Sequence, residues 1–263
     1  MCGRYASSRK PEDLVEEFEI VDDRVEKPLA PDFNVAPTKD VYAVVERPPS
    51  KEGAPRDGSS VASSGTNAAP QRQLRVLRWG LVPSWAKDPS IGSRMINARM
   101  ETVAEKPAYK RAFAARRCLL PADGYFEWYP TSQLTKSGKP RKQPFFIRPQ
   151  DGGVLAMAGL YEIWRDPTRA DDDPERFRWT CTVLTTEAED AVGHIHDRMP
   201  LSVDRERWAA WLDPSTPRDS LLDLLVPAQQ GNLEAFPVSV AVGNVRNNGP
   251  ELVEPLPLEE ALE

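Results

Sequence analysis

The sequence predicts a single α+β domain in which a mixed, largely antiparallel sheet closes into a barrel-like core with peripheral helices. Three observations favour this fold class. The chain has 263 residues, which places it at the upper edge of one domain with a sizeable core. Hydrophobic residues make up 40% of it, and seven tryptophans and eight phenylalanines supply bulk for that core. Segments with strand patterns outnumber segments with helical spacing.

The first half of the chain alternates short elements with loops. Apolar residues at helical spacing predict a short amphipathic helix over 11–20. Strands are expected over 40–47 and 74–81. Between them, residues 48–73 are rich in Ser, Gly, Ala and Pro and have no apolar period, so we expect a flexible insertion. After 95–102, a helical stretch is predicted to run to about residue 115.

The second half is predicted to be mostly strands joined by polar loops. Strands are expected at 118–121, 125–128, 144–148, 154–164, 179–185 and 236–240. Loops are expected at 130–143, 165–176 and 194–200, and amphipathic helices at 203–212 and 218–225. The sequence shows no internal repeat. We take 2–253 as the domain and 254–263 as an acidic tail.

Composition limits the class of protein. The net charge is −6 and the pI about 5.2, so the whole molecule does not resemble a nucleic-acid binder, although a local basic groove remains possible. The three cysteines have no CxxC spacing, which argues against a disulfide framework and for a reducing compartment. Without a signal-like or membrane-spanning apolar run, we expect a cytoplasmic monomer without membrane partners, associated with the nucleoid if the source is bacterial.

The amino terminus carries unusual chemistry. Removal of Met1 would leave Cys2 with an α-amine and a thiol on one residue, with reference pKa values of about 8 and 8.5, so both would be appreciably nucleophilic near neutrality. An aldehyde can form an imine with such an amine, and the thiol can then close a five-membered thiazolidine ring. The alternative is that a cysteine stands at this position by chance.

Candidate acid–base groups lie far from Cys2 in the sequence. Glu127 stands between aromatic residues on a predicted strand, where burial would raise its pKa into a useful range. An ordinary solvent-facing glutamate is the alternative. His194 and His196 are the only histidines. A zinc site would need further ligands that the sequence does not cluster, so we expect no metal and no cofactor.

Basic and aromatic residues are interleaved in several short motifs. Asn97 and Arg99 are two apart and would project to one side of an extended segment. An amide can hold a sugar oxygen there while a guanidinium binds phosphate. With tryptophans available for stacking, this pattern suits a single-stranded nucleic-acid groove. For each arginine the alternative is an ordinary surface ion pair. The further candidates are Arg4, Arg198, Arg246, Trp85 and Trp128.

These motifs, taken in order, resemble one family. They are Cys2-Gly3-Arg4-Tyr5, Asn34-Val35-Ala36-Pro37, Trp79-Gly80, Asn97-Ala98-Arg99 with Glu101-Thr102, Gly124-Tyr125-Phe126-Glu127-Trp128, His196-Asp197-Arg198-Met199-Pro200 and Ala241-Val242-Gly243-Asn244-Val245. The chain is thereby similar, over about 2–253, to the SRAP family of abasic-site processing proteins, also called SOS response-associated peptidases.

The resemblance implies a covalent reaction with abasic sites in single-stranded DNA, in which the Cys2 aminothiol forms a thiazolidine crosslink with the ring-opened sugar and protects the lesion during the DNA damage response. It implies that Glu127 is the acid–base group at the amine, that His196 assists ring opening and that Asn97 positions Cys2. The implied DNA-binding residues are Arg4, Asn34, Trp85, Arg99, Trp128 and Arg198. Ala86-Lys87 stands where some relatives have a second tryptophan, and the insertion has no clear counterpart.

Two other functions remain open at the level of the sequence. The same residues could make an N-terminal-cysteine thiol peptidase that cleaves peptides or only its own terminus. The arginines and tryptophans could make a non-covalent reader of modified single-stranded DNA. The aminothiol fits covalent capture and the peptidase, whereas the basic and aromatic residues fit capture and the reader. Blocking the amino terminus would separate them, because it should abolish the crosslink and leave DNA binding intact.

Overall fold

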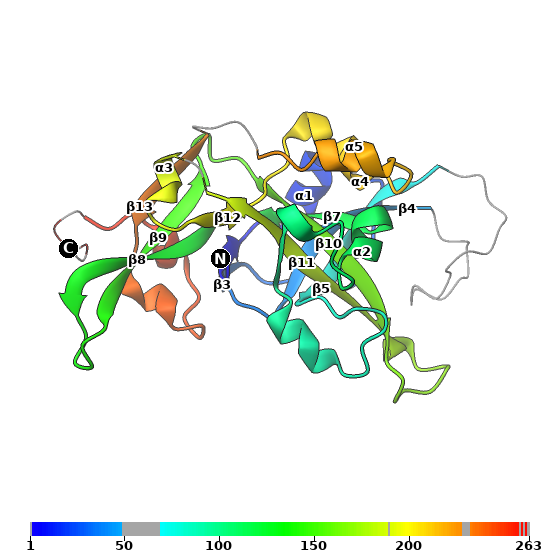
Figure 1. The fold of residues 1–263 in the computed structure, drawn as a ribbon, viewed down its shortest axis with the longest axis horizontal. Helices are drawn as coiled ribbons and strands as arrows, with labels where there is room; N and C mark the ends of the chain where they lie inside the picture. Colours follow the sequence, from blue (N-terminus) through cyan, green and yellow to red (C-terminus); the bar gives the residue numbers. More distant parts are fainter. Residues whose placement is uncertain are drawn as a thin grey trace.

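The computed structural model of the protein describes residues 2–48, 69–188, 190–227, 232–257, 259 and 261. Its strands form two sheets, one curled into a barrel and one open, which lie on either side of the amino terminus (Figure 1). The expected α+β class with a mixed, largely antiparallel and barrel-like core is confirmed. Within the described residues, no helix is long and apolar enough to cross a membrane.

Five strands close the barrel. Neighbours are antiparallel in the order β5, β4, β7, β10 and β11, and β11 then pairs with β5 in parallel, which completes the ring. Three short strands, β2, β6 and β12, extend this sheet at its edges. The bounds are Asp22–Asp23 (β2), Asp40–Arg47 (β4), Gln71–Trp79 (β5), Asn97–Arg99 (β6), Arg117–Ala122 (β7), Leu155–Arg165 (β10), Phe177–Glu187 (β11) and Arg198–Pro200 (β12).

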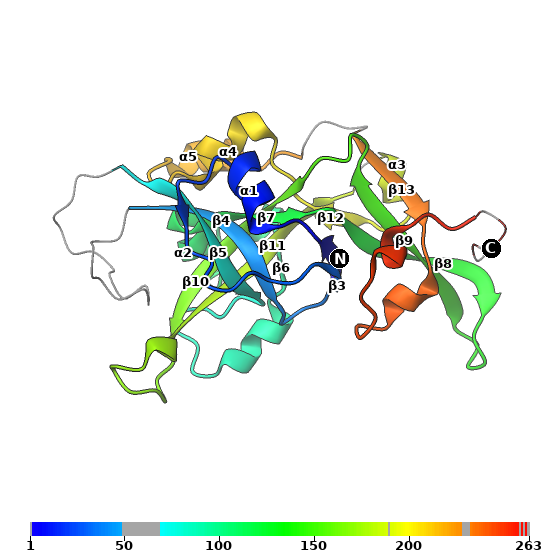
Figure 2. The ribbon, with the colours of Figure 1, turned by 180° about the vertical axis from the view of Figure 1, so that it is seen from behind.

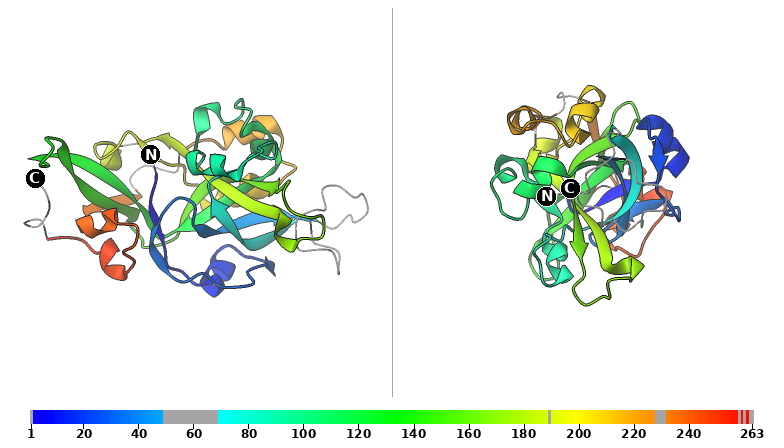
Figure 3. Two further views of the ribbon diagram at one scale, coloured as in Figure 1. Left: turned by 90° about the horizontal axis from the view of Figure 1, so that it is seen from below. Right: turned by 90° about the vertical axis from the view of Figure 1, so that its right-hand side faces the viewer.

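The open sheet carries the amino-terminal strand. Its order is β13, β9, β8, β1 and β3, and every pairing in it is antiparallel. Seen from behind, the amino terminus lies between this sheet and the barrel (Figure 2), and the view from below shows the same arrangement (Figure 3). The bounds are Tyr5–Ser7 (β1), Asp32–Val35 (β3), Gly124–Leu134 (β8), Pro140–Pro149 (β9) and Leu233–Pro237 (β13).

Helices cover the outside of the barrel. Strand β4 has apolar residues on both faces. Val41, Ala43 and Val45 belong to the cluster inside the barrel, whereas Tyr42 and Val44 point outward into a cluster with the helices. In that cluster Phe18 stacks on Trp208 with ring centroids 4.4 Å apart. The helices on the barrel are Pro11–Glu17 (α1), Lys110–Ala115 (α2), Trp208–Leu212 (α4) and Arg218–Asp223 (α5), whereas Asp190–Gly193 (α3) lies beside β13 of the open sheet. Short 3-10 helices lie at Pro89–Arg94, Met100–Thr102, Pro174–Arg176, Arg205–Arg207, Val240–Gly243 and Pro250–Val253, the last two of them against the open sheet.

The insertion is shorter than the sequence predicts. Strand β5 begins at Gln71, and Gln73 is buried and donates to Asp22 at 3.0 Å, so residues 71–73 belong to the barrel. The side chains of 71–73 are polar, so the sequence shows no apolar pattern there. These residues belong to the sheet through backbone pairing with β4 and, at Gln73, with β2. The remainder of the predicted insertion, 49–68, lies outside the described residues.

The predicted loop over 130–143 is a hairpin. Strand β8 continues to Leu134 and strand β9 begins at Pro140, so only 135–139 lie outside strands. Most side chains in this part of the hairpin are exposed, because the two strands extend beyond the core and are held there by backbone pairing. The sequence therefore shows no hydrophobic pattern for them. Three smaller differences concern where elements begin. The helix expected to run to 115 begins only at Lys110, β12 lies inside the loop predicted at 194–200, and β13 begins at Leu233.

Candidate active site

Cys2 lies where the two sheets meet. It leads into β1, which is paired with β8 on one side and β3 on the other. The side chain is fully buried and belongs to the same apolar cluster as Tyr5 and Trp79, whose rings lie 5.1 Å apart at one end of the barrel interior. The residue is therefore fixed by the fold and is not part of a free tail.

Asn97 holds the backbone of Cys2. Its Nδ2 donates to the carbonyl oxygen of Cys2 at 2.7 Å, and its own backbone carbonyl accepts from the Tyr109 hydroxyl at 3.2 Å. Strand β6 places it by pairing in parallel with β11. The Oδ1 of Asn97 is buried and accepts no hydrogen bond. The predicted meeting of Asn97 with the Cys2 region is thus present, with one acceptor atom unused.

Glu127 is buried on the face of β8 that carries Tyr125. Phe126 lies on the opposite face, in the cluster with Phe146, so the alternation expected from the sequence is observed. Glu127 is 4% exposed, and burial raises its pKa to about 7. The solvent-facing alternative for this residue is therefore wrong.

The thiol of Cys2 is a much weaker acid than expected. Burial, followed by the negative charge of Glu127, raises its pKa to about 12. This value applies to the chain that still carries Met1, so the thiolate fraction expected for the processed terminus stays a prediction. The negative charge of Glu127 opposes ionisation of the thiol.

His196 is oriented by its own loop. The backbone N–H of Arg198 donates to His196 Nδ1 at 2.9 Å, and Asp197 Oδ1 lies 2.9 Å from the same nitrogen. Nδ1 cannot serve both at once: the neutral ring accepts from Arg198, and the protonated ring donates to Asp197. Burial lowers the pKa of His196, so the neutral ring with its proton on Nε2 is favoured.

Lys142 is a site residue that the sequence did not reveal. Its charge lowers the pKa of both Glu127 and His196, after larger contributions, and the Asp197 charge raises the pKa of Glu127. The β9 strand and the His196 loop therefore lie beside Glu127. Lys142 was missed because its segment reads as a polar loop. His194 is exposed, and the described residues contain no cluster of metal-ligating side chains.

Arg4 and Asn34 hold the 240–247 loop. Arg4 Nη1 donates to Asn34 Oδ1 at 2.7 Å and to the Val242 carbonyl at 2.8 Å, and its guanidinium lies 5.7 Å from the centroid of the partly buried Trp128 ring. Asn34 is fully buried and donates to the carbonyls of Val242, Asn244 and Asn247. In this arrangement Asn34 has no surface to offer DNA, so the structure supports a positioning role for it.

Arg198 and Arg99 differ in their surroundings. Arg198 is 8% exposed and forms a bidentate pair with Glu101 at 2.6 and 3.1 Å, and it also donates to the Thr185 carbonyl. Arg198 thus links β12, on which it lies, to the segment that follows β6, and this contact lies within the protein. Arg99 is exposed and has no ion pair or hydrogen bond from its side chain within the described part of the chain. Trp85 is 57% exposed. Arg99, Arg246 and Trp85 are the predicted arginine and tryptophan candidates that are exposed.

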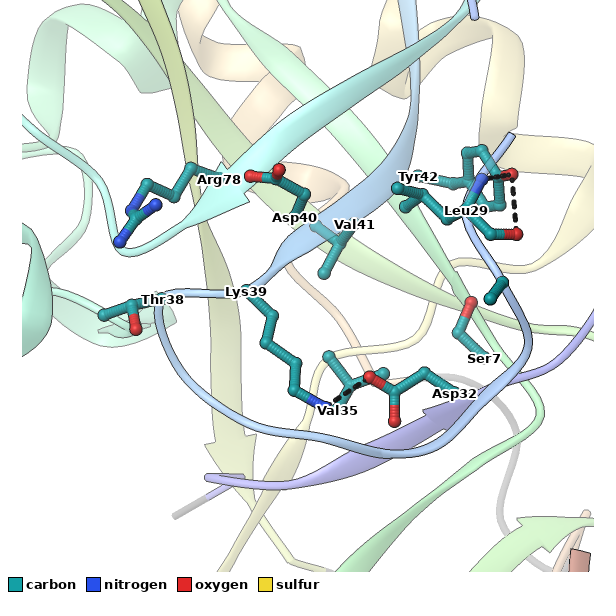
Figure 4. A pocket seen from close by; sticks show the side chains of 11 residues that line it. Ser7, Leu29, Asp32, Val35, Thr38, Lys39, Asp40, Val41, Tyr42 and Arg78 are labelled. Carbon is teal, nitrogen blue, oxygen red and sulfur yellow. Dashed lines mark hydrogen bonds and ion pairs between the residues drawn. The ribbon is translucent and has the colours of Figure 1, made fainter. Parts of the chain in front are cut away.

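A cavity of about 330 Å³ lies apart from these groups, between β3, β4 and β5 (Figure 4). Lys39 crosses it to Asp32, with Nζ and Oδ2 2.5 Å apart, and also donates to the Asn34 carbonyl. None of the residues predicted for catalysis or DNA binding lines it. The reactive groups therefore gather at the junction of the sheets, and the cavity is a separate feature.

The geometry can now be compared with known proteins. The sequence is 36% identical to the abasic site processing protein YoqW of Bacillus subtilis over 255 residues, covering 97% of this chain and 99% of that protein. It is 30% identical to YedK of Escherichia coli over 97% of this chain and all of the relative. The abasic site processing protein HMCES of Gallus gallus is 34% identical over 72% of this chain and 59% of its own length.

Solved structures share the fold. A protein from Bacteroides thetaiotaomicron superposes with a TM-score of 0.75 at 23% identity, over 97% of this chain and all of that one. A phage-related protein from Bordetella bronchiseptica gives 0.61 at 26% identity, over 90% and 94% of the two chains. The profile described as SOS response associated peptidase (SRAP) matches residues 1–245. With that match across nearly its whole length, the chain belongs to the SRAP family.

Proposed function

We propose that the protein processes abasic sites in single-stranded DNA by covalent capture of the ring-opened sugar on Cys2. The observation that carries the proposal is the position of Cys2, next to Met1 in the sequence, buried beside Glu127 and held through its carbonyl by Asn97. The abasic site processing names of its relatives support the same substrate.

The first step is attack by the amine. Once Met1 is removed, the neutral α-amine of Cys2 adds to the C1′ aldehyde, and the carbinolamine loses water to give an imine. This order follows from the thiol, whose pKa of about 12 keeps it protonated at neutral pH. A carboxyl group with a pKa of about 7 can take the proton that the amine loses and return one to the departing hydroxyl, which is the role we assign to Glu127.

The second step closes the ring. The Cys2 sulfur adds to the imine carbon, its proton passes through Glu127 to the nitrogen, and the C1′ carbon becomes bonded to both sulfur and nitrogen. The net reaction joins the aldehyde and the aminothiol with loss of one water. The Asn97 contact fixes the Cys2 backbone so that amine and thiol reach one carbon, which favours the intramolecular step.

His196 is assigned to opening of the sugar ring. The closed hemiacetal must lose its hydroxyl proton and regain one on the ring oxygen before the aldehyde appears. With Nδ1 accepting from the Arg198 N–H, the neutral imidazole carries its proton on Nε2, and we assign Nε2–H to a hydrogen bond with the ring oxygen while the hydroxyl proton is passed to that oxygen. The lowered pKa of His196 keeps this form populated at neutral pH.

The DNA strand is proposed to run past the exposed groups at the junction. Arg99 and Lys142 provide cations for phosphates, and Trp85 provides an exposed ring for stacking. Arg4, Asn34, Trp128 and Arg198 support this surface by holding the loops around it. Binding then falls with added salt even though the whole chain is acidic.

A thiol peptidase is the weaker assignment. Such an enzyme needs a thiolate, and here burial and the negative charge of Glu127 oppose its formation. Autocatalytic removal of Met1 would meet the same obstacle. The family description contains the word peptidase, but the electrostatics of this site suit amine-first chemistry better.

The test is intact-protein mass spectrometry with a single-stranded oligonucleotide that carries one abasic site. The processed protein should give a stable adduct with the mass of protein plus oligonucleotide minus one water. Cys2→Ser keeps the amine and removes the thiol, so it should give an adduct only when a borohydride reductant traps the imine. A stable, unreduced adduct with Cys2→Ser, or with a chain whose amino terminus is blocked, would overturn the proposal.

A further inference from the structure

The barrel interior has a second end, opposite the Cys2 site. Inward-facing side chains form one apolar cluster that begins at Cys2 and Tyr5, passes Cys181 and reaches Tyr161, with Trp179 packed against it. The pairing of β10 with β11 sets Tyr161 opposite Cys181 and places Trp179 two residues farther along. The outer ends of β4 and β5 lie at this side, away from the amino terminus (Figure 1).

Two arginines converge on one indole ring at this end. The guanidinium carbon of Arg75 lies 4.3 Å and that of Arg47 4.9 Å from the ring centroid of Trp179, and Tyr161 stacks on the same ring at 5.5 Å. Arg75 also donates from Nε to Gln73 at 2.8 Å. Within the described residues neither guanidinium has a carboxylate partner, and Arg47 makes no hydrogen bond.

The neighbouring charges do not compensate this pair. Arg24 is engaged by Asp22 at 2.7 Å and Arg116 by Glu162 at 2.6 Å, so the nearby carboxylates already have partners. Burial, followed by the charges of Arg47 and Arg24, lowers the pKa of Arg75 to about 10, against smaller opposing contributions from Tyr161 and Asp22. Within the described residues these two cations lie side by side without a carboxylate at ion-pair distance, and an anion bound to both would relieve their mutual repulsion.

We propose that this end of the barrel, defined by Arg47, Arg75 and Trp179, is a binding site for a phosphate group. Guanidinium groups bind phosphate oxygens in a bidentate manner, and two cations match the charge of about −2 on a phosphate monoester. The phosphate can come from a free nucleotide or from a DNA strand, and the two sources share this chemistry. The site is separate from Cys2 and does not depend on the reaction proposed there.

The test follows the indole N–H signal of Trp179 by NMR in the full chain, with the signal assigned by Trp179→Phe. The probes are inorganic phosphate, deoxythymidine 5′-monophosphate and an undamaged single-stranded oligonucleotide, each at matched ionic strength in sodium chloride. The Trp179 signal should shift as a binding probe is added, and the shift should reach saturation. Arg75→Gln and Arg47→Gln should each weaken binding by about tenfold, the effect of one lost charge-assisted contact. Arg78→Gln, an exposed arginine on the same strand, should change nothing.

The outcomes distinguish the two sources of phosphate and also test the proposal itself. A response to inorganic phosphate or the mononucleotide identifies a free phosphate ligand, and a response to the oligonucleotide alone identifies a DNA strand. If Arg75→Gln disturbs folding, Arg47→Gln tests the same site, because the Arg47 side chain makes no hydrogen bond or ion pair within the described residues. No saturable shift with any probe, or an equal loss in Arg78→Gln, would overturn the inference, whether or not Cys2 forms a crosslink.

Discussion

Replacing Glu127 by glutamine should stabilise the protein while it abolishes most of the chemistry. The folded protein holds this carboxyl group in an environment that favours its neutral form, with a pKa of about 7 against a reference of 4.5. Glutamine has nearly the same shape and no charge at any pH. The substitution therefore removes the cost of a buried charge together with the proton that the site can move.

The sign and size of the stability effect follow from linkage. Between pH 4.5 and 7 the unfolded chain ionises Glu127 while the folded chain does not, so this group makes the folded state progressively less stable as pH rises through that window. The loss is about 1.4 kcal/mol per pH unit and reaches at most about 3 kcal/mol, after which it is constant. Glu127→Gln lacks this loss and should be more stable than the parent by about 1–3 kcal/mol at pH 8, and equal to it at pH 4.

Denaturant unfolding at pH 4 and pH 8 measures the difference. Glu162→Gln is the matched control, because Glu162 is also 4% exposed but is paired with Arg116 at 2.6 Å, so its replacement should destabilise. In parallel, Glu127→Gln should slow crosslinking by about 10²-fold or more, the usual contribution of an acid–base group. A pH-independent loss of stability, or an unchanged crosslinking rate, would refute the reasoning.

Further substitutions separate positioning, DNA contact and structural support. Asn97→Ala removes the hydrogen bond to Cys2 and should slow crosslinking by about tenfold with DNA affinity nearly unchanged, as a kinetic titration would show. Arg99→Ala should lower the slope of log affinity against log salt by about 0.7 without loss of stability, and a steeper slope would contradict the phosphate role. Arg198→Ala should instead lower the unfolding free energy by about 2 kcal/mol, measured in urea, because it breaks a bidentate pair. Trp85→Ala should weaken oligonucleotide binding by about 1–3 kcal/mol in fluorescence anisotropy with an unchanged melting temperature, and equal affinity would exclude stacking there.

The local structure around Glu127 and Asn97 was predicted well from the sequence because its signals are local. The alternation in 125–128 correctly placed Glu127 opposite Phe126, and strand spacing correctly put Asn97 and Arg99 on one short extended segment. The aminothiol of Cys2 stays a prediction that depends on removal of Met1. For these residues the pattern of two or three neighbours was sufficient.

What the sequence missed depends on partners that are distant along the chain. Whether Arg198 faces DNA or Glu101 is decided by a contact across 97 positions, and Asn34 is buried by a loop more than 200 residues away. The acidity of the Cys2 thiol depends on burial between two sheets. Lys142 reached the site only because a polar segment extends β9, which no apolar pattern could signal.

The central claim is that one carbon of the abasic sugar becomes bonded to both the nitrogen and the sulfur of Cys2. The most direct measurement is ¹³C NMR of the adduct, with the label at C1′ of the abasic site in a single-stranded oligonucleotide. We expect one tetrahedral carbon signal of the thiazolidine type, coupled to nitrogen in a ¹⁵N-labelled protein and absent with Cys2→Ala. A persistent imine carbon, or the unchanged signal of the free sugar, would contradict it.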